Sequence, residues 1–184
     1  FEHLEIWGRG IDLSHFRPVR FNGRLEEMER PVFLNVGRVS PEKNLEAFAE
    51  LDLPGTKIVI GDGPARAKLI EKYPQVVFTG HVADEDLPAC YTAADVFVFP
   101  SRTDTFGNVM LEAMACGTPV AAYPVTGPID VVQSGQTGVL DEDLAAAAMS
   151  ALHCDGRICR RYAESLPWSR LVRQFEGYLV EARK

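Results

Sequence analysis

The stretch DVFVFPSRTDTFGNVMLEAMACGTPVAAY, residues 95–123, decides the fold that we expect. Its opening run is apolar without alternation, which is typical of a strand covered on both faces, and predicts a strand over residues 95–100. A helix is predicted over 106–116, ending at Gly117, a residue that suits a left-handed C-cap. A second strand is predicted over 119–123. This order of strand, helix and strand indicates a parallel α/β layer.

The same rhythm extends in both directions along the chain. Further strands are predicted at 32–39, 57–61, 76–80 and 138–140, and further helices at 44–51, 64–73, 87–94, 129–134, 144–154 and 168–182. Pro64 suits the first turn of its helix, where a missing N–H costs nothing. We therefore expect an α/β fold, Rossmann-like and doubly wound. It has a mostly parallel sheet, helices on both faces and a helical C-terminal segment. The 184 residues suit a single domain, 1–184.

Composition excludes several classes of function. The formal net charge of −7 disfavours nucleic-acid binding, which needs clustered Lys and Arg. No apolar run approaches the roughly 20 residues that cross a bilayer, and no signal peptide is visible. The four cysteines form no CxxC pair, which disfavours zinc and redox dithiol sites and favours free thiols in a reducing cytoplasm.

Ligands of open parallel sheets bind outside the carboxyl ends of the strands. Segments 37–43, 61–64, 80–82, 101–108 and 124–128 follow predicted strands, and we expect them to line one crevice. In the first of them, Arg38 and Lys43 suit a diphosphate, because Arg offers a planar fork and Lys a point charge. The alternative is that both pair with Glu42 or Glu46 on the surface.

Two carboxylates flank the start of the helix predicted over 106–116. Asp104 precedes its first turn, where N–H groups and the helix dipole attract anions, and Gly107 would let a ligand approach the backbone. Glu112 lies two turns in on an apolar stretch and needs water or a hydrogen-bond partner, which sugar hydroxyls could supply. Alternatively, Asp104 is an ordinary N-cap and Glu112 lies on a solvated face.

Two other features carry weaker signals. Residues 61–66 resemble a dinucleotide fingerprint, but Arg66 occupies the position of its third glycine, which favours a tight turn into a helix. His81 is a lone loop histidine, usually structural or solvated. No Ser-His-Asp or Cys-His arrangement can be assembled from spacing alone.

Taken together, these segments resemble the C-terminal domain of the family 4 retaining glycosyltransferases, which have the GT-B architecture. The resemblance covers nearly the whole chain, and its strength lies in the correct order of several motifs. The matching segments are 7–12 with Phe16 and Pro18, 36–38 with 42–44, 61–64, 77–80, Tyr91 with 93–95, and 99–120.

The resemblance implies a role for each matching site residue. Arg38 and Lys43 would hold the donor diphosphate and stabilise the leaving nucleoside diphosphate. Glu112 would bind the donor ribose, and Asp104, the third residue of the implied catalytic set with Arg38 and Lys43, would contact the donor sugar. The family usually has Glu at the position of Asp104, so the reach of this shorter carboxylate and the identity of the sugar stay open. The remaining donor-binding residues that the resemblance implies are Gly37, His81, Val82, Phe106, Gly107, Asn108 and Val109.

The resemblance also implies substrates and partners. The donor would be GDP-mannose or a UDP-hexose, used without a metal or other cofactor, and the acceptor a sugar or lipid. The family's N-terminal acceptor domain is expected to be missing from this chain, which alone would bind nucleotide but catalyse little. The helix beginning near Trp168 would cross back toward that domain.

The expected location is the cytoplasm, with a peripheral contact at the inner membrane face as a further option. Arg157, Arg160 and Arg161 could meet an anionic membrane surface, although the nearby Asp155 and Glu164 favour an ordinary exposed helix face.

Three other functions stay open. One is a sugar-nucleotide epimerase or a glycogen-synthase-like enzyme of the same fold. Another is a non-catalytic nucleotide-binding module, against which the paired cations and carboxylates argue. The third is a dinucleotide oxidoreductase domain, which the broken glycine fingerprint disfavours.

Overall fold

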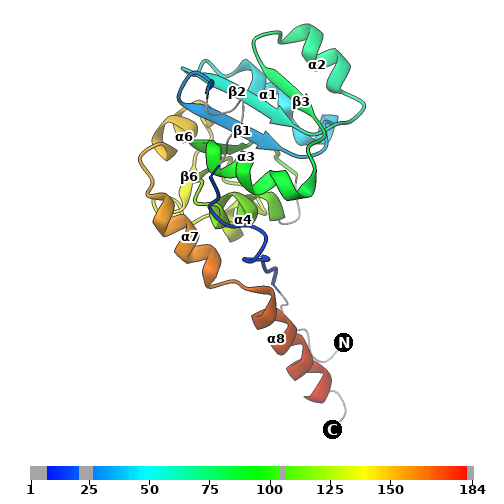
Figure 1. Cartoon of the computed structure of the whole chain (residues 1–184), viewed down its shortest axis with the longest axis vertical. Helices are drawn as coiled ribbons and strands as arrows, with labels where there is room; N and C mark the ends of the chain where they lie inside the picture. Colours follow the sequence, from blue (N-terminus) through cyan, green and yellow to red (C-terminus); the bar gives the residue numbers. More distant parts are fainter. Residues whose placement is uncertain (1–7, 21–26, 104–106, 182–184) are drawn as a thin grey trace.

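A computed structural model describes residues 8–20, 27–103 and 107–181 of the chain (Figure 1). Its centre is a six-stranded sheet in the order β3-β2-β1-β4-β5-β6, with every neighbouring pair parallel. The strands are β1 Val32–Val36, β2 Thr56–Ile60, β3 Val77–Gly80, β4 Val96–Phe99, β5 Val120–Ala122 and β6 Gly138–Leu140. The expected doubly wound α/β fold is confirmed, and all six predicted strands are present.

Helices cover both faces of the sheet because successive strand residues point to opposite sides. Phe33 and Val59 face one core with α1 Leu45–Glu50, α2 Arg66–Lys72 and α6 Leu144–Ala151. Leu34 and Ile58 face the other core with α3 Leu87–Ala93, α4 Asn108–Ala115, α5 Pro128–Val131 and α7 Gly156–Glu164. Two short 3-10 turns, η2 Pro41–Lys43 and η3 Asp84–Asp86, follow the sheet's carboxyl edge.

Several predicted boundaries differ from the structure, and the first strand and α2 show why. The strand expected over 32–39 ends at Val36, because the chain beyond it turns onto the loop after β2, where the Val39 N–H donates to the Asp62 carbonyl at 2.9 Å. The helix expected from Pro64 begins at Arg66, so Pro64 lies in the preceding turn.

The end of α4 agrees with the sequence. Gly117 adopts the left-handed conformation (φ 86°), and its N–H donates to the Met114 carbonyl at 3.0 Å. The Thr118 N–H donates to the Ala113 carbonyl at 2.9 Å, which completes a Schellman motif.

The last helix, α8 Trp168–Glu181, projects from the body of the molecule (Figure 1). Its start is held by the N-terminal segment: the Ile11 N–H donates to the Leu166 carbonyl at 3.0 Å, and the Trp168 N–H to the Ile11 carbonyl at 3.4 Å. A Cβ on Gly10 would lie 3.0 Å from the Trp168 backbone, so the two segments are in close contact. Among the described residues, no helix combines the length and apolar character needed to span a bilayer.

Candidate functional site

A cavity of about 310 Å³ opens at the carboxyl ends of β1, β2 and β3. It brings together four of the residues that the sequence singled out, namely Gly37, Arg38, His81 and Val82. Three of the five predicted loops therefore meet here. The other lining residues are Val36, Ile60, Gly61, Asp62, Asp84 and Leu87.

The floor of this cavity is built by loops packed backbone to backbone. The Gly37 N–H donates to the Ile60 carbonyl at 3.0 Å, and the Gly61 N–H donates to the Gly80 carbonyl at 2.8 Å. A Cβ on Gly61 would collide with the Gly37 carbonyl oxygen. The loop after β2 then turns into α2 at Arg66, as the tight-turn interpretation of residues 61–66 predicted.

Arg38 is exposed and pairs with Glu42, with 2.7 Å between Nη2 and Oε1. Glu42 also accepts a hydrogen bond from the Ser40 hydroxyl, and this bond, followed by its own backbone N–H and Arg38, lowers the pKa of the Glu42 carboxyl. The surface-pair alternative therefore describes Arg38 in this structure. An exposed pair of this kind contributes little to stability, so Arg38 can exchange Glu42 for an anionic ligand at small cost.

Lys43 ends the 3-10 turn η2 and is half-buried. It does not line the 310 Å³ cavity, although it belongs to the same loop as Arg38. The loop is fixed from its far end, because the side-chain amide of Asn44 donates to the Pro100 carbonyl at 3.0 Å. The end of β4 therefore positions the segment that carries both cations.

The N-terminus of α4 differs from the expectation. The helix begins at Asn108 with Gly107 as N-cap (φ 74°), later than the predicted start at residue 106. The left-handed conformation of Gly107 favours glycine, and a Cβ there would also press on the flexible end of Met110, at 2.6 Å from Cε, and on the Phe99 ring at 3.2 Å. The first-turn N–H groups of Asn108 and Val109 have no partner within an α-helix and can face an anion. Asp104 and Phe106 lie outside the described residues.

Glu112 is half-buried, so the solvated-face alternative is wrong. Its Oε2 accepts a hydrogen bond from the Tyr91 hydroxyl at 2.8 Å. Burial raises the pKa of the Glu112 carboxyl, while the bond from Tyr91 and the charge of His15 act in the opposite direction. Asp84, which lines the cavity, acts in the same direction as burial.

The sequence analysis assigned no role in the site to Tyr91 or His15. Tyr91 is fully buried in α3, and a local pattern reveals only that it faces the core. His15 is held by the Asp12 carboxylate, which accepts from the His15 N–H at 3.2 Å, and its ring meets Phe16 edge to face at 4.6 Å. In the sequence, the resemblance of segment 7–12 and Phe16 to the glycosyltransferase family was the feature that pointed to the region around His15.

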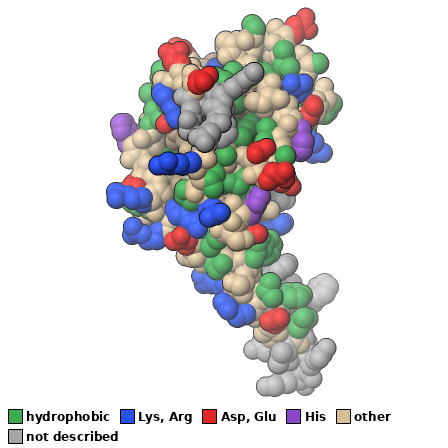
Figure 2. Space-filling view, viewed as in Figure 1, with side chains coloured by type: hydrophobic (Ala, Val, Ile, Leu, Met, Phe, Trp, Pro, Cys, Tyr) green, Lys and Arg blue, Asp and Glu red, His purple; other side chains and the backbone are tan. Residues whose placement is uncertain are grey.

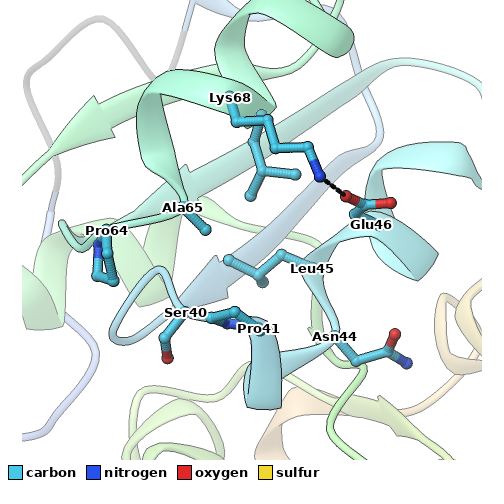
Figure 3. A pocket seen from close by; sticks show the side chains of 9 residues that line it. Ser40, Pro41, Asn44, Leu45, Glu46, Pro64, Ala65 and Lys68 are labelled. Carbon is cyan, nitrogen blue, oxygen red and sulfur yellow. Dashed lines mark ion pairs between the residues drawn. The ribbon is translucent and has the colours of Figure 1, made fainter.

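A second cavity, of about 440 Å³, lies between the starts of α1 and α2 (Figure 3). Pro41, Leu45 and Leu69 contribute apolar walls, and Lys68 reaches across to Glu46, with 3.5 Å between Nζ and Oε1. None of the residues predicted for donor binding lines this cavity, among those that the structure describes. It is therefore separate from the cavity that contains Arg38.

The arginines of α7 do not form a shared basic patch. Arg160 turns inward, and its Nη1 donates to the carbonyls of Phe16 and Ala115, each at 2.8 Å. Arg157 is exposed and pairs with Asp155 at 2.7 Å. The proposed membrane contact through three arginines is wrong for Arg160, because its guanidinium serves internal carbonyls.

No group of three or more His, Cys, Asp or Glu side chains able to hold a metal ion occurs within residues 8–20, 27–103 and 107–181.

The chain matches the family model of the glycosyl transferases group 1 over residues 30–155. A GDP-mannose-dependent alpha-mannosyltransferase of Mycolicibacterium smegmatis is 40% identical over 142 residues, covering 73% of this chain and 37% of the relative. The sulfoquinovosyl transferase SQD2 of Arabidopsis thaliana is 35% identical over 191 residues, covering 90% of this chain and 37% of the relative. The chain thus spans little more than a third of the length of these relatives.

Solved structures agree on the fold. Sucrose-phosphate synthase from Thermosynechococcus elongatus superposes with a TM-score of 0.79 at 27% identity, over 97% of this chain and 52% of the other. The Anabaena protein HepE, solved with UDP and glucose, has a TM-score of 0.72 at 21% identity, over 94% of this chain and 55% of the other.

Proposed function

This chain belongs to the glycosyl transferases group 1, and from that premise we propose that it is the donor-binding domain of a retaining hexosyltransferase. The observation that carries the proposal is the cavity at the carboxyl ends of β1 to β3, which gathers Gly37, Arg38, His81 and Val82. Such an edge is where open parallel sheets bind nucleotides.

In the proposed complex, the donor lies across this edge of the sheet. Arg38 and Lys43 hold the diphosphate, and the N–H groups at the start of α4 add a fixed positive potential. His81 and Val82 border the base, and Glu112 accepts hydrogen bonds from the ribose. Asp104 contacts the sugar, and Gly37 and Phe106 complete the donor contacts.

The proposed reaction breaks the bond between the sugar's anomeric carbon and the diphosphate oxygen and forms a bond from that carbon to an acceptor hydroxyl. The hydroxyl proton leaves with the nucleoside diphosphate. Arg38 and Lys43 stabilise the charge that develops on the leaving group, which is why we propose no metal cofactor. The anomeric configuration of the product, read by NMR, tests retention.

We further propose that the acceptor, a sugar or lipid, binds a separate domain that packs on α8. Trp168, Val172 and Leu179 recur along one face of this helix and are 41–52% exposed. Figure 2 shows hydrophobic side chains along the projecting part of the molecule. On this proposal the 184-residue chain alone binds donor but transfers sugar far more slowly than a two-domain enzyme. If the chain alone transferred sugar at a rate comparable to that of a two-domain enzyme, the proposed need for a second domain would be refuted.

The relatives supply the order in which donors should be tried. The Mycolicibacterium smegmatis relative is named as GDP-mannose-dependent, and HepE was solved with UDP. GDP-mannose is therefore the first donor to test and a UDP-hexose the second.

The four free cysteines support a reducing, cytoplasmic setting.

Calorimetric titration with GDP, UDP and NAD, each with and without EDTA, tests the proposal. GDP or UDP should bind equally well with EDTA, and Lys43→Ala should weaken binding about 10- to 100-fold, the range expected for a charge-assisted contact. Lys68→Ala, a lysine on the separate 440 Å³ cavity, is the matched control and should leave binding unchanged. Binding of NAD alone, or equal affinity of Lys43→Ala and wild type, would refute the assignment.

A further inference from the structure

The Tyr91 side chain is fixed more firmly than core packing alone requires. Its ring has no exposed surface and lies between Phe16 and Phe97, with ring centroids 6.2 and 5.7 Å away. Both contacts are edge to face, a favourable aromatic geometry. The hydroxyl at the end of this ring donates to Glu112 Oε2 at 2.8 Å, which joins α3 to α4.

A second hydrogen bond ties α3 to the segment that follows α4. The Thr118 hydroxyl donates to the Tyr91 carbonyl at 2.6 Å. Thr118 is itself placed by the Schellman motif that ends α4, since its N–H donates to the Ala113 carbonyl. Glu112 in α4 and Thr118 just beyond it therefore both hydrogen-bond to Tyr91.

We propose that Tyr91 is a positioning residue, whose hydroxyl holds the Glu112 carboxylate in place as an acceptor for the ribose hydroxyls of the donor. This inference rests on the proposed function. A carboxylate offers about four lone-pair sites on two oxygens. Tyr91 occupies a site on Oε2, so the rest of the carboxylate stays available to a ligand.

The electrostatics of the pair explain why a hydroxyl is needed here. Burial favours the neutral form of Glu112 and raises the pKa of its carboxyl, and the nearby Asp84 acts in the same direction. The Tyr91 bond and the charge of His15 oppose that rise. Burial and Glu112 raise the pKa of Tyr91 well above its ordinary value, so it remains a donor at neutral pH. An ionised Glu112 is a stronger acceptor than a neutral one.

Tyr91→Phe removes the hydroxyl and keeps the ring. GDP and UDP should bind this variant about tenfold more weakly at pH 7, while their 2′,3′-dideoxy counterparts should bind as they do to wild type. The preference for ribose should therefore largely disappear. The matched control is Tyr73→Phe, because Tyr73 also donates to a glutamate, Glu50, in the other hydrophobic core. The Tyr73→Phe variant should keep the full wild-type preference for ribose over 2′,3′-dideoxyribose.

A titration without nucleotide tests the pair independently of donor binding. NMR of the Glu112 side-chain carboxyl should show a higher pKa in Tyr91→Phe than in wild type, and raising the pH should restore GDP or UDP affinity in the variant. An unchanged pKa would overturn the positioning role, as would an unchanged preference for ribose. If wild type bound neither nucleotide, the proposed function would fail, while the carboxyl titration would still decide whether Tyr91 controls Glu112. In the Glu112→Ala background, where the acceptor is gone, Tyr91→Phe should have no further effect on ribose preference.

Discussion

Replacing Arg160 with alanine should destabilise the chain far more than replacing its neighbour Arg157. Arg160 Nη1 donates to the carbonyls of Phe16 and Ala115 at 2.8 Å, and its Nε pairs with Glu164 at 2.8 Å. Only 22% of its side chain is exposed. The guanidinium thus caps the C-terminal end of α4 and ties the N-terminal segment to it.

The magnitude follows from the two carbonyls. A hydrogen bond from a charged donor contributes about 1.5–3 kcal/mol. Ala115 has no exposed surface, so its carbonyl loses its partner without access to water, while the half-buried Phe16 segment can be rehydrated. We therefore expect Arg160→Ala to lower the free energy of unfolding by about 2–4 kcal/mol. With a urea slope of about 2.5 kcal/mol/M, the midpoint falls by about 1–1.5 M.

Urea denaturation followed by circular dichroism measures both variants. Arg157, whose side chain is 87% exposed, pairs only with Asp155 among the contacts described for its side chain, and Arg157→Ala should leave the midpoint unchanged within error. Equal midpoints for Arg160→Ala and Arg157→Ala would show that the inward bonds of Arg160 contribute nothing and would refute the reasoning.

Four shorter predictions concern other positions. Gly61→Ala should abolish GDP and UDP binding and lower the urea midpoint, because its Cβ would collide with the Gly37 carbonyl, and calorimetry with denaturation checks both effects. Gly177→Ala, where a Cβ meets open space within α8, should instead raise the midpoint, with about 0.5–1 kcal/mol from helix propensity. Glu112→Gln should raise the free energy of unfolding at pH 7, because burial raises the pKa of the wild-type carboxyl and its ionised form opposes folding. That gain should vanish as the pH falls through the raised pKa, and denaturation at several pH values would show it. A chromogenic disulfide reagent should modify the half-buried Cys154 first, and a different order of peptides by mass spectrometry would contradict this. The slower thiols are buried, with pKa raised to about 11 or 12: Cys90, Cys116 and Cys159.

The central strands could be predicted because they are short, mostly apolar runs buried on both faces, as in Val96–Phe99. Their exact ends could not. Val36 and Val39 are both buried, but the first pairs within the sheet and the second packs in a loop against Asp62, and hydrophobicity alone does not distinguish these environments.

Part of the candidate site was equally accessible from the sequence. Gly37, Arg38, His81 and Val82 meet in one cavity because the carboxyl ends of neighbouring parallel strands share an edge. Contacts between helices could not be predicted from the sequence. Tyr91 and Glu112 are 21 residues apart and Arg160 and Phe16 are 144 apart, so no local spacing links them. Lys43 and Glu112 lie outside the cavity, and their place in the donor site stays a prediction.

The bonds between Ile11 and the start of α8 have a consequence for how the molecule opens. They join parts of the chain that lie near opposite ends of the sequence, and Gly10 leaves no space between them. Segments linked in this way exchange their amide protons as one cooperative unit. The Ile11 and Trp168 amides should therefore share a single opening free energy, and trimming either segment should lower the protection of the other.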